Sequence, residues 1–165
     1  LVGSEMCIRD SCWMSASAGG DHTCGVTTSG SVECWGSDYF GQSSSPSGTF
    51  AMVSAGEHHT CGVTTSGSVE CWGSDSYGKA SPPSGTFATV STGGAHTCGV
   101  TTSGSVECWG RDNWGQASPP SGTFATVSAG EHHTCGVTTS GSVETSGSVE
   151  CWGEDTSGQS SPPEL

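Results

Sequence analysis

The chain has 165 residues, of which 27 are glycine, 31% are hydrophobic and 12% are charged. This apolar content is too small for one large conventional core and favours repeating units that each bury a face on the next. The formal charge is −13, with only three Lys and Arg, so phosphate groups could hardly be neutralised and we expect no nucleic-acid partner. No apolar run approaches the roughly 20 residues that cross a bilayer, so we expect no membrane insertion.

Residues 1–11, LVGSEMCIRDS, share no phase with the rest of the chain and resemble the translation of a transposon-end sequencing adapter. We therefore exclude this segment from reasoning about the fold and expect Cys7 and Arg9 to be non-native. On this interpretation the natural N-terminus is missing, and the lack of a visible signal peptide carries no information. An irregular natural tail is the alternative.

A 37-residue repeat begins at Cys12, and it places the segment HTCGVTTSGSVECWG at residues 22–36, 59–73 and 96–110, with a fourth start at His133. A fixed period of this size indicates a repeat architecture. We predict an all-β fold in which each repeat forms four short antiparallel strands joined by glycine-rich turns, which is typical of a propeller blade. The four blades are expected at about residues 12–48, 49–85, 86–122 and 123–165. Cys12 has no counterpart in the other repeats, and its state stays open.

The repeated segment predicts a β-hairpin, because β-branched and apolar stretches flank a Thr-Ser-Gly turn signal. A three-residue loop with a left-handed Gly30 would set Val26 opposite Val32 and Cys24 opposite Cys34. Opposed positions on neighbouring strands bring Cβ atoms to about 4.5–5.5 Å, close to disulfide range. We predict one disulfide per repeat, in the pairs Cys24 and Cys34, Cys61 and Cys71, Cys98 and Cys108, and Cys135 and Cys151. Such bridges indicate an oxidising compartment, so we expect an extracellular or cell-surface location.

In the last repeat the six residues TSGSVE occur twice, so Cys135 and Cys151 stand 16 residues apart instead of 10. Either the hairpin register slips and separates the cysteines, or residues 139–147 bulge into a longer loop. We favour the bulge, because a longer loop costs only a fraction of a kcal/mol, whereas slippage would misplace buried side chains. An error in the underlying nucleotide sequence explains the duplication equally well.

Residues 54–83, SAGEHHTCGVTTSGSVECWGSDSYGKASPP, resemble the regulator of chromosome condensation repeat, with its Ala-Gly-x-x-His start, Gly-x-Val hairpin, Trp-Gly pair and Gly-Gln ending. These elements recur in phase over nearly all of residues 12–163. The resemblance implies a β-propeller, usually seven-bladed in that family, so we expect four blades to form a partial, open arc of a longer array. The chain departs from the family pattern in its cysteines and in four aspartates that stand where the family commonly has Asn: Asp38, Asp75, Asp112 and Asp155.

Some relatives in this family act as exchange factors for small GTPases, and one secreted bacterial relative inhibits β-lactamases. Fold alone transfers neither activity to this chain. The sequence contains no glycine-rich phosphate loop, nucleophile elbow or HExxH motif, so we expect neither catalysis nor a cofactor.

Histidine precedes the first cysteine of each pair by two residues, at His22, His59, His96 and His133, so a zinc site is conceivable. The paired cysteines already satisfy each other and no fourth ligand is evident, so we expect no metal. We expect these histidines instead to hydrogen-bond the backbone of a neighbouring blade. Each repeated Asp follows the Trp-Gly pair, where a short carboxylate can cap turn backbone, and one carboxylate per turn is too few for calcium.

The repeats differ from one another in two segments that an up-and-down blade carries on the same face. Aromatic and acidic side chains gather there, and Trp and Tyr supply much of the energy at interfaces. Neutral drift after duplication explains this variation equally well. The candidate binding residues are Tyr39, Phe40, Glu57, His58, Tyr77, Asn113, Trp114, Glu131 and His132. A tryptophan that occurs in every copy is expected to pack between blades: Trp35, Trp72, Trp109 and Trp152.

We therefore expect a secreted or cell-surface module that binds a protein or a glycan through loops on one face, without catalysis. The alternative is a disulfide-stabilised structural spacer or stalk in a larger surface protein.

Overall fold

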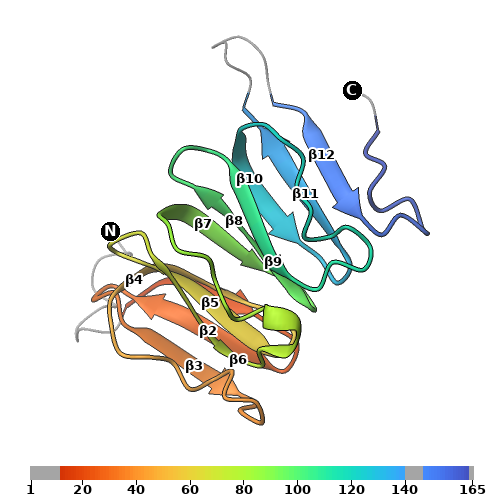
Figure 1. Cartoon of the computed structure of the whole chain (residues 1–165). Helices are drawn as coiled ribbons and strands as arrows, with labels where there is room; N and C mark the ends of the chain where they lie inside the picture. Colours follow the sequence, from red (N-terminus) through yellow and green to blue (C-terminus); the bar gives the residue numbers. More distant parts are fainter. Residues whose placement is uncertain (1–11, 140–146, 164–165) are drawn as a thin grey trace, which may run out of the picture.

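The computed structural model of the chain describes residues 12–139 and 147–163. Over these residues the chain forms four antiparallel three-stranded sheets, each built from strands that follow one another in sequence. Figure 1 shows the four sheets side by side in chain order, from β2 and β3 in orange to β12 in blue. The strands are β1 (Trp13–Ala18), β2 (His22–Thr27), β3 (Val32–Gly36), β4 (Phe50–Ala55), β5 (His59–Thr64), β6 (Val69–Gly73), β7 (Phe87–Thr92), β8 (His96–Thr101), β9 (Val106–Gly110), β10 (Phe124–Ala129), β11 (His133–Thr138) and β12 (Val149–Gly153).

This architecture is the all-β, open propeller arc that the repeat pattern predicts, with one correction. Each described blade has three strands and not four. The segments after β3, β6, β9 and β12 carry turns, and the second blade adds a short 3₁₀ helix, η1 (Ser76–Gly78). Residues 1–11, which we assign to an adapter, lie outside the described residues.

The predicted fourth strand is replaced by a turn that an aspartate caps. In the first blade, Ser43 N and Ser44 Oγ donate to the two carboxylate oxygens of Asp38, at 2.8 and 2.7 Å. These bonds, led by the one from Ser44, hold the pKa of Asp38 below its usual range. Asp75, Asp112 and Asp155 repeat the arrangement, which confirms the predicted capping role. Local side-chain bonds thus satisfy backbone groups that a strand would have paired.

The hairpin register is the predicted one. Gly30 is left-handed, with a φ of 83°, and Val26 pairs with Val32 while Cys24 pairs with Cys34. The opposed cysteines bring their Cα atoms to 4.0–4.1 Å, and all four predicted pairs are bonded: Cys24–Cys34, Cys61–Cys71, Cys98–Cys108 and Cys135–Cys151. Cys12, whose state the sequence leaves open, is also disulfide-bonded.

The last hairpin keeps its register in spite of the duplication. Cys135 pairs with Cys151 and Val137 with Val149, as the bulge interpretation predicts. Residues 140–146, which contain most of the inserted loop, lie outside the described residues. The pairing of His133–Thr138 with Val149–Gly153 is thus kept in spite of the duplication.

Neighbouring blades pack through apolar side chains. Cys24, Val26 and Val32 on the hairpin of the first blade contact Phe50 and Val53 of the second, and Trp72 lies against this cluster. The same contacts recur at the next two junctions, where Trp109 and Trp152 join the core. The predicted packing of the tryptophans between blades is therefore confirmed at three positions.

Trp35 is the exception to this packing. It lies on the outer side of the first sheet, where no described blade covers it, and it is half exposed. Its ring instead contacts Trp13 edge-on, with centroids 5.6 Å apart.

A glycine inside each hairpin makes room for the aromatic ring of the inner strand. A Cβ atom at Gly99 would lie 2.7 Å from Phe87 Cδ1 and 3.0 Å from the Thr89 carbonyl oxygen. The ring therefore packs against the bare backbone of β8, which explains why a glycine follows the first cysteine in every repeat.

Replacing both Cys98 and Cys108 with alanine should lower the free energy of unfolding by about 2–4 kcal/mol, because the bridge closes a short loop in the unfolded chain. Urea unfolding of the oxidised protein measures the change. As the matched control, both proteins are unfolded under reducing conditions, where their free energies of unfolding should become equal. Equal stability of the oxidised proteins would contradict the structural role of the bridge.

Candidate functional site

A buried threonine hydroxyl joins each pair of neighbouring blades. Thr97 Oγ1 of the third blade donates to the Lys79 carbonyl oxygen of the second at 2.9 Å, and it lies 2.8 Å from His59 Nε2, also of the second blade. Because the hydroxyl has only one proton, it must accept from His59, so Nε2 carries the hydrogen. Thr60 and Thr134 repeat this arrangement with His22 and His96.

The backbone partner predicted for these histidines is therefore wrong. They bond a threonine side chain of the neighbouring blade, and it is this hydroxyl that reaches the backbone. The same carbonyl oxygen also accepts the indole N–H of the next blade's tryptophan, as in the 2.9 Å contact from Trp109 Nε1 to Lys79. One carbonyl oxygen thus accepts two hydrogen bonds from the adjacent blade. These bonds fix the position of that blade relative to the one that carries the carbonyl group.

Burial keeps these histidines neutral. It lowers the pKa of His59 to about 3 and that of His96 to about 4, and it also lowers the pKa of His22. The Nδ1 atoms of all three are buried without a hydrogen-bond partner. A proton on Nδ1 would therefore be both desolvated and unpaired, which explains the direction of the shift.

These junctions align four turns into an open groove on one face of the arc. The turns between the first two strands of each blade line a hollow of about 400 Å³, and its lining residues are Ala and Gly together with Glu57, Thr92 and Glu131. The turns are linked by backbone hydrogen bonds, from Gly20 N to Gly56 O, from Glu57 N to Gly93 O and from Gly94 N to Gly130 O. Backbone hydrogen bonds thus hold the turns that line the groove next to one another.

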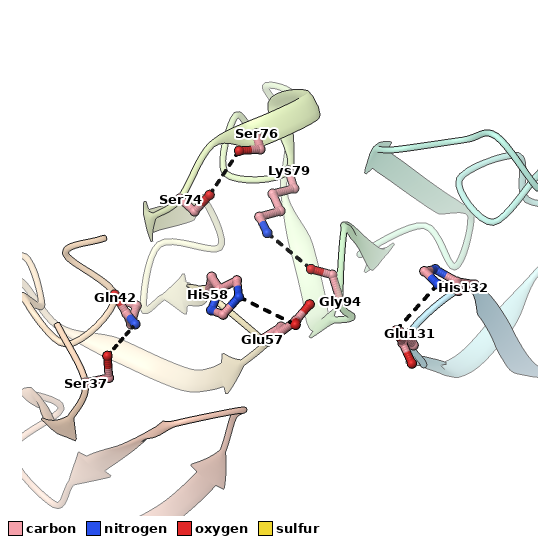
Figure 2. A network of polar contacts seen from close by, with 10 residues as sticks. All are labelled: Ser37, Gln42, Glu57, His58, Ser74, Ser76, Lys79, Gly94, Glu131 and His132. Carbon is pink, nitrogen blue, oxygen red and sulfur yellow. Dashed lines mark hydrogen bonds and ion pairs between the residues drawn. The ribbon is translucent and has the colours of Figure 1, made fainter. Parts of the chain in front are cut away.

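The loops that follow the third strand of each blade border this groove and carry exposed aromatic side chains. The Phe40 ring of the first blade lies 5.1 Å from the His58 ring of the second, and Tyr39 contacts Phe40 edge-on at 4.9 Å. His58 Nε2 is 3.5 Å from a carboxylate oxygen of Glu57 (Figure 2), and Glu57 also lines the groove. The structure thus brings four of the candidate residues into one cluster that spans two blades.

The other candidates lie on the second, third and fourth blades. Tyr77 is exposed, and the guanidinium of Arg111 lies 5.5 Å from the centre of its ring. His132 Nε2 is 3.5 Å from a carboxylate oxygen of Glu131 (Figure 2). Trp114 and Asn113 are exposed on the loop of the third blade. We define the rim as these nine candidate residues: Tyr39, Phe40, Glu57, His58, Tyr77, Asn113, Trp114, Glu131 and His132.

Sequence reasoning missed the role of Lys79. In the other blades a glutamine holds this place, and its side-chain oxygen accepts from the backbone two residues earlier, as in the 2.8 Å bond from Phe40 N to Gln42. A lysine cannot accept that bond. Its ammonium group instead reaches the Gly94 carbonyl oxygen at 3.2 Å (Figure 2), and Tyr77 adopts a left-handed φ of 67°. The only signal in the sequence is the one Lys among four equivalent positions.

In the part of the chain that the structure describes, no group of three or more His, Cys, Asp or Glu side chains is placed to hold a metal ion. No helix of that part is long and apolar enough to cross a membrane.

The fold and the groove define the chain as an arc of a disulfide-bridged β-propeller. The family model described as "Regulator of chromosome condensation (RCC1) repeat" matches residues 15–42, 53–79 and 87–116, which together make up about half of the chain. The chain therefore belongs to the RCC1 repeat family. No curated protein sequence matches it.

Solved structures show the same architecture. The chain is 32% identical to the CRINKLY WD40 ectodomain of the Arabidopsis thaliana receptor kinase ACR4, with a TM-score of 0.69 over 87% of this chain and 51% of that one. For the entire ectodomain of the Physcomitrella patens receptor kinase CR4, identity is 26% and the TM-score 0.72, over 88% of this chain and 42% of that one. Yeast RCC1 (Prp20), solved bound to Kap60, shares the fold at 16% identity, with a TM-score of 0.74 over 89% of this chain and 45% of that one. The chain thus spans about half, or less, of these structures.

Replacing Thr97 with valine should lower the free energy of unfolding by about 1–3 kcal/mol, because the His59 N–H loses its buried acceptor and Lys79 O loses a donor. The control is Thr102→Val, in which an exposed hydroxyl bonded to Thr86 is removed. That change should stay within about 0.5 kcal/mol. Chemical denaturation measures both, and equal effects would refute the bridging role.

Stability should fall as the pH drops below the ordinary histidine pKa of 6.5. Since the folded-state pKa values of His59 and His96 are about 3 and 4, the unfolded chain binds more protons than the folded chain between these values and 6.5. Each of the two histidines should thus cost about 2 kcal/mol at about pH 5 relative to pH 7. Urea unfolding at both pH values tests this. The variant His59→Leu should show a shallower pH dependence, and an unchanged slope would contradict the assignment.

Proposed function

We propose that the chain is a non-catalytic module that binds a protein through the rim, outside the cell. The observation that carries this proposal is the exposure of large aromatic side chains in a fixed arrangement. Tyr39 is 87% exposed and Tyr77 65% exposed, although both rings are held by contacts with Phe40 and Arg111. Solvent-exposed aromatic rings that are already ordered lose little entropy on binding and are suited to recognition.

Charge supports a partner with a basic surface. The two basic side chains of the described residues are engaged, Lys79 with the Gly94 carbonyl and Arg111 with the Tyr77 ring. The carboxylates of Glu57 and Glu131, by contrast, are about half or more exposed at the groove. With a formal charge of −13, the chain would attract a positively charged partner and repel an acidic one.

The extracellular location is supported by the disulfides and by the similarity to two receptor kinase ectodomains. Cross-strand bridges persist in oxidising compartments. Yeast RCC1 (Prp20), solved bound to Kap60, is an example of the fold binding a protein.

A structural spacer is the second candidate, and the regularity of the junctions favours it. Each described junction repeats the same threonine bridge, and each blade carries its own disulfide. This construction stabilises an extended array whether or not the rim binds anything. The rim is therefore the part of the molecule that discriminates the two functions.

The test replaces Tyr39, Phe40, Tyr77 and Trp114 together with alanine and probes arrays of basic peptides and of glycans. We expect the wild-type chain to bind basic peptides and the variant to lose roughly 30-fold in affinity, the loss of one strong interface residue. The control variant carries Ser29→Ala, Ser66→Ala and Ser103→Ala in the hairpin turns at the other end of the blades. Binding to glycans alone would contradict the protein partner. Equal binding by all three proteins, or none, would favour the spacer.

A further inference from the structure

One aromatic ring of the rim already carries a cation that belongs to this chain. The Arg111 guanidinium of the third blade lies 5.5 Å from the centre of the Tyr77 ring of the second blade. An aromatic face attracts a cation at this distance, and arginine is the more frequent partner in proteins. The contact therefore shows which group a ring at this place in the repeat can bind.

Phe40 and Trp114 stand at the place of Tyr77 in the first and third blades. Both rings are about half exposed, and the amide of each residue donates at 2.8 Å to a glutamine side chain two residues later. The two loops therefore share the same local hydrogen bond. Both basic side chains of the described residues are engaged elsewhere, so no cation from that part of the chain covers these two rings.

The blade that follows each of these two rings supplies a carboxylate. Glu57 stands at the junction with the Phe40 blade, and Glu131 stands at the junction with the Trp114 blade. The junction between these two has Gly94 at the same place in the repeat. A carboxylate thus accompanies each ring that lacks a cation, and a glycine takes its place where the chain supplies its own arginine.

The two glutamate side chains are placed alike. A Cβ atom at Gly20 would lie 3.5 Å from Glu57 Cγ, and one at Gly94 would lie 3.1 Å from Glu131 Cγ. Each glutamate side chain therefore lies against the bare backbone of the preceding blade, which is the blade that carries the ring. This close approach explains the glycine that stands one repeat before each glutamate.

At the first of these junctions a histidine connects the ring to the carboxylate. The His58 ring lies 5.1 Å from the Phe40 ring, and its Nε2 lies 3.5 Å from a carboxylate oxygen of Glu57. His132 and Glu131 repeat the second contact at 3.5 Å. We define the first site as Phe40, Glu57 and His58, and the second site as Trp114, Glu131 and His132.

We propose that the first site and the second site each bind an arginine side chain of a protein partner. This inference rests on the proposed function, because it names the groups that the rim would recognise. A planar guanidinium can lie on the ring, as Arg111 lies on Tyr77, while its N–H groups donate to the carboxylate. A lysine presents a point charge without this planar fork, so it should bind more weakly.

The two sites can act together on one partner. Figure 2 shows their Glu-His pairs on either side of Gly94, so the junction that has its own arginine lies between them. A partner chain that carries two arginines can therefore engage both sites, and its second contact is favoured by the high effective concentration that the first contact creates. The rim would thus select the spacing of arginines as well as their charge.

The experiment measures peptide binding to the full oxidised chain by isothermal titration calorimetry. The probes are synthetic peptides with two arginines joined by Gly-Ser linkers of about 2 to 12 residues, and the same peptides with lysine in place of arginine. We expect the affinity of the arginine peptides to pass through a maximum at one linker length. At that length it should exceed the affinity of the lysine peptide roughly tenfold.

Two variants test the parts of the first site. Phe40→Leu removes the ring and keeps an apolar side chain, and Glu57→Gln removes the charge and keeps the shape. Each should weaken binding of the best arginine peptide roughly fivefold, while Phe40→Trp should strengthen it, because tryptophan binds cations best. Glu70→Gln is the matched control: it removes the same charge from an exposed position of β6 in the same blade and should bind like the wild type.

The outcomes separate this inference from the proposed function. Suppose that basic peptides bind the wild type, but lysine serves as well as arginine, or Glu57→Gln and Glu70→Gln weaken binding equally. The arginine sites are then overturned, and the proposed function stands. If no basic peptide binds the wild type, the proposed function fails and this inference fails with it. A preference for arginine that Phe40→Leu and Glu57→Gln both reduce supports the inference.

Discussion

One buried hydroxyl sets the position of each blade relative to the next. Thr60, Thr97 and Thr134 each lie between a histidine and a main-chain carbonyl oxygen of the preceding blade, and each is fully buried. Since the carbonyl oxygen can only accept, the hydroxyl proton and the histidine tautomer are both determined. The indole N–H of a tryptophan shares the same carbonyl oxygen, so rotation of one blade against another would break several buried bonds at once.

The groove and the rim follow from this constraint. Turns from four blades can share one line of backbone hydrogen bonds only because the blades are held at a repeated spacing. The loops above them are then free to differ, since their shape is maintained locally by the capping aspartates. The second blade differs in this way: Lys79 replaces the glutamine of the other blades, Tyr77 has a left-handed φ, and the Arg111 guanidinium lies over the Tyr77 ring. A rigid frame with replaceable loops is a common basis for binding.

The repeat also explains the two exposed faces of the arc. In a stacked array each unit completes its core only against its neighbours, so the outermost faces keep the apolar residues that inner units bury. Trp35 and Trp109 occupy equivalent positions with the same neighbours in sequence, yet one is 50% exposed and the other 9%. Their difference is therefore a property of position in the described array.

The period, the hairpin register, the four cysteine pairs and the turn-capping aspartates could all be predicted from the sequence, because each depends on residues within about one repeat of one another. Even the register of the lengthened hairpin was predictable, since only one register keeps Cys135 opposite Cys151 and Val137 opposite Val149. Three features could not be predicted from the sequence. These are the absence of a fourth strand, the threonine partners of the histidines and the hydrogen bond from Lys79 to Gly94. The histidine and lysine contacts join residues of neighbouring blades. At the fourth strand, hydrogen bonds from local side chains compete with pairing into the sheet, and the turn forms instead of the strand. Only the three-dimensional packing of the blades decides distances of that kind, because spacing along the chain does not encode them.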